Sequence, residues 1–250
     1  MKEFLKRVLP QNAVGYLRQV RDALIDIYAI KSYSQEGEDM ILRRIFQDHP
    51  TKGFYVDVGA FHPKTFSNTY FFYKRGWSGI NIDATPNSMK LFEQERPRDT
   101  NIEAAVAREQ REITFYLYKY SNFNSADKRF SSEALGVDRN DFPDYCVGEQ
   151  KVVTRTLREI LDQNLPAGQR IDFLSVDVEG MDMEVLQSND WQHFRPRYIL
   201  VECALNLSAN EVADNEVGQF LEQQDYELFA KTCNTAIFRD VLDVLPLNPV

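Results

Sequence analysis

The sequence has no excess of basic residues. Its 38 acidic residues outnumber the 29 basic ones, which gives a formal net charge of −9. A protein that binds nucleic acid along a broad surface needs a basic face to neutralise phosphates. This charge balance therefore argues against such a surface, and we expect no nucleic-acid partner.

Cysteines and long apolar runs are also scarce. The three cysteines, Cys146, Cys203 and Cys233, are odd in number and widely spaced, which favours reduced thiols over disulfides or a zinc site. No apolar run approaches the roughly 18 residues of a membrane span, and the N-terminus has no uninterrupted apolar core of a secretion signal. We therefore expect a cytoplasmic protein without a transmembrane segment.

A glycine-rich dinucleotide fingerprint is missing as well. The stretch "FYVDVGAFHP" at 54–63 runs from an apolar strand into Asp57 and Gly59, but the pattern G-x-G-x-x-G is absent. A pyrophosphate needs a glycine-rich turn with free backbone amides, whereas this turn contains the bulky Phe61 and Pro63. The turn therefore disfavours an NAD-dependent enzyme.

What the chain does contain is a regular alternation of strand and helix patterns. Strands are expected at 54–58, 79–83, 101–106, 112–119, 151–155, 171–176, 197–202, 226–230 and 235–239. Helices are expected at 38–48, 67–75, 86–96, 157–163, 182–188 and 211–223. Repeated βα units predict an α/β fold with a mostly parallel sheet covered on both faces. The last two strands lie close in sequence, which predicts an antiparallel pair at the sheet edge.

Two segments stand apart from this alternation, and we expect one domain over 32–250 beside them. Residues 1–31 form an N-terminal amphipathic helical segment that either packs on the body or on a second subunit, or lies weakly on a membrane surface. A homodimer and peripheral membrane attachment are therefore alternatives here. Residues 120–150 are polar and too long for an ordinary connection, which predicts a lid-like insertion. Its aromatic and amide side chains suit a sugar.

Acidic residues follow four of the expected strands. They are Asp57, Asp83, Asp177 with Glu179 close behind it, and Glu202. Ligands of open α/β sheets bind beyond the carboxyl ends of the strands, so these acids predict one shared site. Asp83, at the end of the second strand, suits a ribose diol. A ribose without a pyrophosphate points to S-adenosylmethionine rather than NAD.

The chain resembles the FkbM-type S-adenosylmethionine-dependent methyltransferases. The stretches that carry the resemblance are "SYSQEGEDMIL" (32–42), "FYVDVGAFHP" (54–63), "FSNTYFFYKRGWSGINIDATPNSM" (66–89), "RPRDTNIEAAV" (96–106), "IDFLSVDVEGMDMEVLQSNDW" (171–191) and "YILVE" (198–202). The resemblance implies a Rossmann-like methyltransferase fold. It also implies methyl transfer to a hydroxyl, often on a sugar or a natural product.

The resemblance further implies roles for individual residues. Gln35 and Glu38 would close over the methionine moiety, and Asp57 and Gly59 would form the first cofactor turn. The remaining implied cofactor contacts are Ser67 and Asn68 at the start of a helix, Asp83 at the ribose, and Glu103 and Ala104 beside the adenine. Asp177 would face the transferred methyl group and the acceptor.

Methyl transfer to a hydroxyl needs a positioned base, a metal ion, or both, because the hydroxyl is a weak acid. Asp177 is the main candidate base, and His62, in the loop after the first strand, is the second. Asp177 and Glu202 end neighbouring strands, so their carboxylates could instead bind Mg²⁺. Both readings stay open at the level of sequence.

The sequence therefore predicts an O-methyltransferase that acts on a saccharide or glycoconjugate. A small natural product is the alternative acceptor. A non-catalytic module that binds an adenosine ligand or a partner protein is the alternative from another class. The acids at four strand ends make that last reading the weaker one.

Overall fold

The structure is a computed structural model that describes residues 29–47, 52–127, 145–203 and 207–243, together with residues 15, 16 and 20. The chain divides into two compact units, Met1–Ser32 and Tyr33–Val250. The N-terminal segment and residues 128–144 of the 120–150 insertion lie largely or wholly outside the described residues. Among the residues that are described, no helix is both long and apolar enough to cross a membrane.

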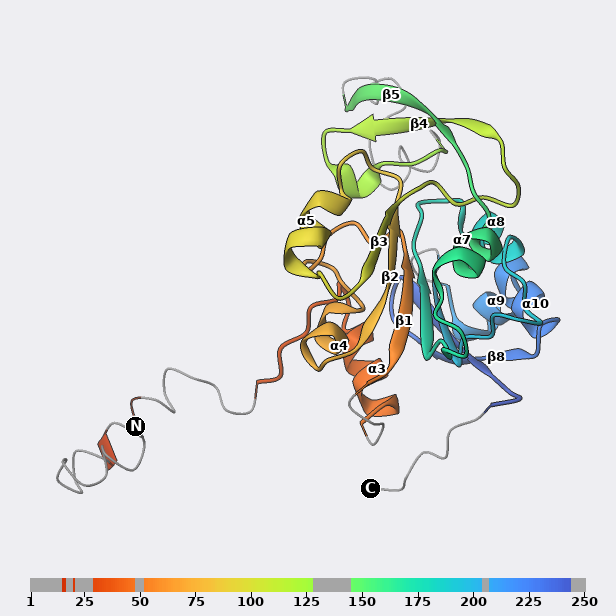
Figure 1. Ribbon diagram of the computed structural model, residues 1–250. Helices are drawn as coiled ribbons and strands as arrows, with labels where there is room; N and C mark the ends of the chain where they lie inside the picture. Colours follow the sequence, from red (N-terminus) through yellow and green to blue (C-terminus); the bar gives the residue numbers. More distant parts are fainter. Residues whose placement is uncertain are drawn as a thin grey trace. The chain divides into compact units, whose positions relative to one another are not determined.

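A seven-stranded sheet forms the centre of the second unit, in the order β3-β2-β1-β6-β7-β9-β8. Its parallel strands are β1 (Phe54–Val58), β2 (Ser78–Asp83), β3 (Thr100–Glu103), β6 (Phe173–Val176) and β7 (Tyr198–Glu202). The edge strands β8 (Tyr226–Lys231) and β9 (Thr235–Asp240) run antiparallel. The predicted α/β fold and its antiparallel edge pair are therefore confirmed (Figure 1).

Helices cover both faces of this sheet, on opposite sides of the strands in Figure 1. One side carries α3 (Glu38–Ile45), α4 (Tyr70–Lys74) and α5 (Met89–Glu95). The other carries α7 (Leu157–Asn164), α8 (Asp182–Gln187), α9 (Ala209–Asp214) and α10 (Glu216–Glu222).

Strand β1 shows how the sequence divides its side chains between the two faces. Successive side chains of a strand point to opposite sides. Phe54, Val56 and Val58 belong to the core cluster that includes α7 and α8 residues, whereas Tyr55 belongs to the cluster with α3 and α4 residues. All five residues of β1 are buried, which is typical of a parallel strand covered on both faces.

Several expected elements differ from the structure in their ends: β3 ends at Glu103 and not at 106, and α4 and α5 each begin three residues later than expected. Two further differences are larger. The helix expected at 211–223 is two helices, because Asn215 is extended and its side chain accepts a hydrogen bond from the N–H of Gly218, which starts α10 afresh. The strand expected at 151–155 begins earlier: β5 spans Cys146–Val153. It pairs with β4 (Glu112–Tyr118) in a separate two-stranded antiparallel sheet.

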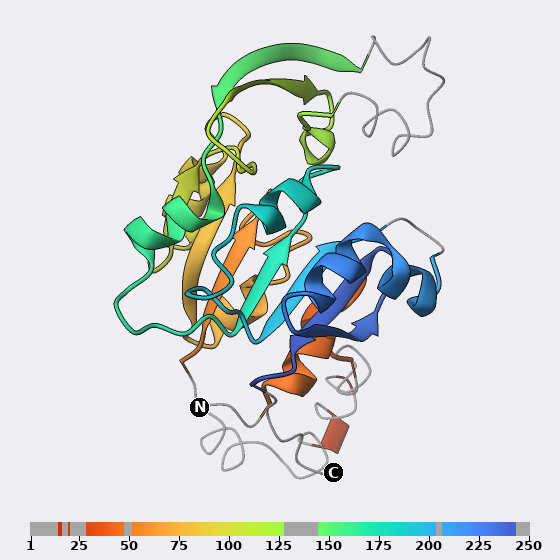
Figure 2. The same ribbon diagram turned by 90° about the vertical axis from the view of Figure 1, so that its right-hand side faces the viewer.

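The β4–β5 hairpin lies beyond the carboxyl ends of the parallel strands, at the top of both ribbon views (Figures 1 and 2). The 3₁₀ helix η1 (Ser121–Phe123) follows β4. Two hydrogen bonds connect this insertion to the sheet below it. The Asn124 amide donates to the Thr85 hydroxyl at 3.2 Å, and the Ser125 hydroxyl donates to the Glu179 carbonyl at 2.7 Å. The insertion is therefore held at two points of the same sheet edge.

Candidate active site

A pocket lies at the carboxyl ends of β1, β2, β6 and β7, below the β4–β5 hairpin. Most of the residues predicted for the site line it: Gln35, Glu38, Gly59, Asn68, Asp83, Ala104, Asp177 and Glu202. The hairpin and η1 contribute Ile113, Phe115, Ser121, Asn122 and Asn124. The predicted residues Asp57, Ser67, Glu103 and His62 are not among the lining residues.

Gly59 allows the β1 turn to approach the end of β6. Its φ is +84°, a backbone conformation that side chains other than glycine rarely adopt. A Cβ atom at this position would also overlap the carbonyl oxygen of Asp177. The single glycine of the turn is therefore required for the close approach of the ends of β1 and β6.

Asp83 ends β2 and holds the loops on either side of it. One carboxylate oxygen accepts from the N–H of Phe61 at 2.9 Å, and the other accepts from the N–H of Thr85 at 2.7 Å. Burial raises the pKa of Asp83, and the bonds from Thr85 and Phe61 oppose that rise. The side chains of Thr85 and Ser88 also contribute hydrogen bonds to this carboxylate, and Asp83 lines the pocket.

Asp57 and Ser67 lie behind the pocket rather than in it. The Asp57 carboxylate is buried and accepts from the Thr69 hydroxyl at 2.9 Å, and Ser175 is its second hydrogen-bond partner. Burial raises the pKa of Asp57, and the nearby Arg96 counteracts the rise. Ser67 is buried too, and its hydroxyl accepts from the N–H of Tyr70.

His62 and Glu103 act on the loops around the site. His62 Nδ1 accepts from the N–H groups of Lys64 and Thr65, both at 3.0 Å, so this nitrogen stabilises its own loop. The Glu103 carboxylate accepts from the N–H of Asn87 at 2.7 Å, at the start of the segment that leads into α5. Of the two predicted bases, Asp177 lines the pocket and His62 does not.

Four carboxyl groups gather around the ends of β6 and β7, and none of the described residues that line the pocket is basic. The pKa of Glu179 is raised to about 8 and that of Asp182 to about 6, in both cases chiefly by burial. The pKa of Asp177 is raised to about 7 by burial, and next by the charges of Asp182 and Asp57. Like charges at short range favour protonation of some members of the group.

Asp177 and Glu202 form the closest pair in this group. Their carboxyl groups are near enough for a hydrogen bond, which requires that one of them keeps its proton. Glu202 is that one, because its pKa is raised well above that of Asp177, first by burial and then by the Asp177 charge. Glu202 therefore donates to Asp177, and Asp177 carries the negative charge.

Asp177 differs from the other acids in its exposure to the pocket. Its side chain lies deep among protein atoms, yet its surface is open to solvent through the pocket. The carboxylate is therefore in contact with solvent in the open pocket. Water that reaches the carboxylate lowers its pKa, so filling the pocket with ligands would remove that water and raise the pKa.

The residues fit S-adenosylmethionine better than they fit Mg²⁺. Acids around the pocket are complementary to a sulfonium and an ammonium group, and the Asp83 carboxylate is an acceptor of the kind that ribose hydroxyls require. In the described part of the chain, no group of three or more histidine, cysteine or acidic residues is placed to hold a metal ion. The magnesium prediction therefore gains no support from the geometry, and we derive no step through a metal.

The N-terminal edge of the pocket is built by a segment that the resemblance had singled out. Glu36 and Glu38 connect it to the turn between β8 and β9. A Glu36 oxygen accepts from the N–H of Asn234 at 2.8 Å, and a Glu38 oxygen accepts from the Thr235 hydroxyl at 3.0 Å. Glu36, Asn234 and Thr235 also line the pocket, although no strand-end pattern in the sequence marked them.

This sheet order and the pocket at the carboxyl ends of its strands are those of a Rossmann-like fold with a ligand site at the usual edge of the sheet. The family model of the methyltransferase FkbM domain matches residues 57–228. The chain belongs to the FkbM methyltransferase family.

Other comparisons add less. The chain is similar to the solved structure of a TehB-like SAM-dependent methyltransferase from Corynebacterium glutamicum, with 12% identity and a TM-score of 0.40. That match covers 93% of this chain and 100% of the other. A likeness this distant carries no argument about the reaction. No curated protein matches the chain.

Proposed function

We propose that the protein is an O-methyltransferase that methylates a hydroxyl of a saccharide or glycoconjugate. The observation that carries this proposal is Asp177, a carboxylate at the pocket surface with a pKa raised to about 7. A general base works best when its pKa lies near the working pH. A hydroxyl acceptor requires such a base, because it must lose a proton when it is methylated.

S-adenosylmethionine supplies the methyl group, and the chain supplies position and proton transfer. Asp83, Asn68 and Ala104 line the part of the pocket predicted for the cofactor. Asp177 accepts the proton of the acceptor hydroxyl at its carboxylate. Glu202 donates to Asp177 and so fixes the direction of the Asp177 lone pairs. Alignment of this kind can account for several kcal/mol of a barrier, on the order of 7–11 kcal/mol in well-oriented systems.

The charge of the pocket favours a neutral acceptor. None of the described residues that line it is a lysine, arginine or histidine. A phosphate or a carboxylate on the acceptor near Asp177 and Glu179 would meet like charge without a compensating cation. A sugar hydroxyl brings no charge, so it fits this set of side chains.

The roof of the pocket supports a saccharide over a purely apolar natural product. Phe115 from β4 and the amide side chains of Asn122 and Asn124 all line the pocket. Sugars present both C–H faces and hydroxyls, and this combination accommodates both. A small natural product with a free hydroxyl remains the second candidate acceptor.

The test is release of S-adenosylhomocysteine against a panel of neutral sugars, anionic sugars, glycan extracts and small phenols. We expect turnover with neutral sugars or glycans, with kcat/KM rising with pH through about 7 as Asp177 loses its proton. Turnover with phenols alone would favour the natural-product reading. Turnover that depends on an anionic acceptor would overturn the proposal.

For residues 1–31 we propose a packing or dimer helix in a cytoplasmic protein, with weak membrane attachment as the alternative. Acids Asp22 and Asp26 accompany the basic residues of this segment and oppose attraction to anionic lipid. Deletion of these residues should change oligomeric state or stability and leave binding to anionic liposomes unchanged. Loss of liposome binding with an intact body would favour the membrane reading.

A further inference from the structure

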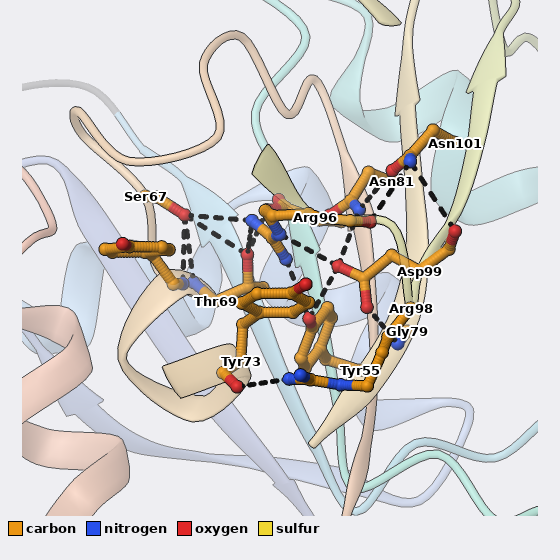
Figure 3. Close-up of polar contacts among 12 residues, drawn as sticks. Tyr55, Ser67, Thr69, Tyr73, Gly79, Asn81, Arg96, Arg98, Asp99 and Asn101 are labelled. Carbon is orange, nitrogen blue, oxygen red and sulfur yellow. Dashed lines mark hydrogen bonds and ion pairs between the residues drawn. The ribbon is translucent and has the colours of Figure 1, made fainter. Parts of the chain in front are cut away.

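A fully buried arginine lies behind the cofactor side of the pocket. Arg96 follows α5, and neither its side chain nor that of Asp99 has any exposed surface. Three aromatic rings surround its guanidinium, those of Tyr55, Tyr73 and Phe92, with centroids 5.2–5.4 Å from the central carbon. A buried charge requires a partner, and Arg96 Nε donates to Asp99 at 2.8 Å (Figure 3).

The other arms of the guanidinium determine the direction of a hydrogen-bond chain. Arg96 Nη1 donates to the Thr69 hydroxyl at 2.9 Å, and a guanidinium has no acceptor. The Thr69 oxygen must therefore accept from Arg96, so its own hydrogen is available for Asp57, 2.9 Å away. Figure 3 shows the Thr69 hydroxyl facing the guanidinium.

The chain continues from Asp57 to the pocket. Ser175 is the second hydrogen-bond partner of the Asp57 carboxylate, which is acceptor only, so Ser175 donates to it. Its oxygen then accepts from the Asn68 amide nitrogen at 3.1 Å. This places the amide nitrogen of Asn68 toward Ser175 and leaves its carbonyl oxygen as the atom for a ligand. Asn68 lines the pocket.

We propose that Arg96 is a positioning residue for the cofactor: through Thr69, Asp57 and Ser175 it orients the Asn68 amide so that its carbonyl oxygen accepts a hydrogen bond from the cofactor. The α-ammonium group and the ribose hydroxyls are donors of the required kind. The inference rests on cofactor binding and not on the identity of the acceptor. Arg96 acts through other residues and does not itself line the pocket.

The test begins with a matched pair at Thr69. Thr69→Val keeps the shape and removes the hydroxyl, whereas Thr69→Ser keeps the hydroxyl. We expect Thr69→Val to raise the Kd for S-adenosylhomocysteine about tenfold, on the scale of a lost hydrogen bond to a charged group. Thr69→Ser should stay within about twofold of the wild type in the same calorimetric measurement. Equal affinities for the two variants would overturn the proposal.

Tyr55→Phe is the control for loss of stability alone. It removes another hydroxyl that contacts Arg96, at 2.8 Å, but one that leads to Asp99 and not to the pocket. We expect it to lower the melting temperature about as much as Thr69→Val does, without change in the Kd. If Tyr55→Phe raised the Kd as much as Thr69→Val does, both increases would follow from general destabilisation of the fold, and the proposal would be overturned.

A double-mutant cycle with Asn68→Ala tests the direction of the chain. If Arg96 and Thr69 act through Asn68, Thr69→Val should weaken binding in the wild type and have no further effect in the Asn68→Ala background. A purely structural role would weaken binding in both backgrounds and would overturn the proposal. If Thr69→Val does not fold, Ser175→Ala takes its place in the same cycle with the same two outcomes. The ligand needs no acceptor, so failure of the saccharide proposal leaves this result unaffected.

Discussion

The acidic residues at two strand ends of the same sheet have opposite electrostatic surroundings. At the end of β1, Asp57 is buried, accepts hydrogen bonds from two hydroxyls and lies near the cation Arg96. At the ends of β6 and β7, the described residues that line the pocket give Asp177 and Glu202 no lysine, arginine or histidine. The Asp177 charge raises the pKa of Glu202, and the hydrogen bond between the two lowers the pKa of Asp177. An acid with a buried cation serves structure, whereas an acid without one can exchange protons.

The comparison explains why the four acids that mark the strand ends do not share one role. Asp57 accepts from the Thr69 hydroxyl behind the pocket, Asp83 accepts from the N–H groups of two loops, and Asp177 lies at the pocket surface as the proposed base. The type of residue at a strand end thus locates the site. The partner of each acid decides what the acid does there.

The largest expected effect is on stability and concerns the buried ion pair of Arg96 and Asp99. Asp99→Asn removes the anion that faces the buried Arg96, and Asp99 also accepts from Tyr55, Asn81 and the N–H of Gly79. Loss of one partner of a buried ion pair costs about 3–5 kcal/mol of unfolding free energy. Urea denaturation measures it. The matched variant at the other end, Glu202→Gln, should cost less than about 1 kcal/mol because no cation depends on it; equal losses would end the comparison.

The second effect is on turnover and concerns Asp177, the proposed base. Asp177→Asn is nearly isosteric and removes the proposed base, so turnover should fall by about 10² or more while the Kd for S-adenosylhomocysteine stays within a few fold. Rates from single-turnover assays and affinities from calorimetry measure the two separately. Addition of EDTA to the wild type, with Mg²⁺ as the restoring ion, tests the metal alternative in the same assay. A fully active Asp177→Asn enzyme would return the search for the base to His62.

The third effect is on cofactor binding and concerns Asp83, which is buried like Asp57 but lines the pocket like Asp177. Asp83→Ala removes both the diol acceptor and the bonds to the N–H groups of Phe61 and Thr85. We expect S-adenosylhomocysteine binding at least about tenfold weaker, or about 1.4 kcal/mol. Adenine binds without a ribose, so its affinity serves as the control. An unchanged Kd for S-adenosylhomocysteine in a folded variant would remove Asp83 from the cofactor site.

Much of the fold was predictable because parallel strands covered on both faces read as continuous apolar runs. The strand expected at 54–58 matches β1, and 79–83 differs from β2 by one residue. The start of β5 was missed because "CVGEQ" at 146–150 pairs only with β4 and is half exposed, so it has no apolar run. The break at Asn215 was missed because a side-chain cap can interrupt an otherwise helical pattern.

The site was predictable in position and less so in chemistry. Strand ends located Asp83 and Asp177, since the carboxyl ends of parallel strands meet at one edge. Arg96 could not be paired with Asp57 from the sequence, because the two meet only when α5 packs against the sheet. Its only sequence signal was the stretch "RPRDTN", in which Arg96 and Asp99 stand three residues apart and form the buried pair. Hydrogen-bond direction, which decides the role of Asn68, has no sequence signal.

The smallest expected effect is on the pH dependence of stability and concerns Glu179. The pKa of Glu179 is raised to about 8, chiefly by burial and next by the Asp177 charge, from an ordinary value near 4.5. The folded state therefore binds more protons than the unfolded state between these two values, so this group contributes stability at low pH that is lost as pH rises through about 8. The glutamine side chain of Glu179→Gln cannot titrate. The unfolding free energy of this variant should therefore fall less between pH 5 and pH 9 than that of the wild type. Between pH 5 and pH 9 we expect the unfolding free energy of the wild type to fall by at least about 1 kcal/mol more than that of Glu179→Gln. This amount corresponds to less than one pKa unit. Urea denaturation at the two pH values measures the difference. A wild-type slope identical to that of Glu179→Gln would mean that water reaches the acids at the ends of β6 and β7 freely, and the contrast with the buried Asp57 would then rest on geometry alone.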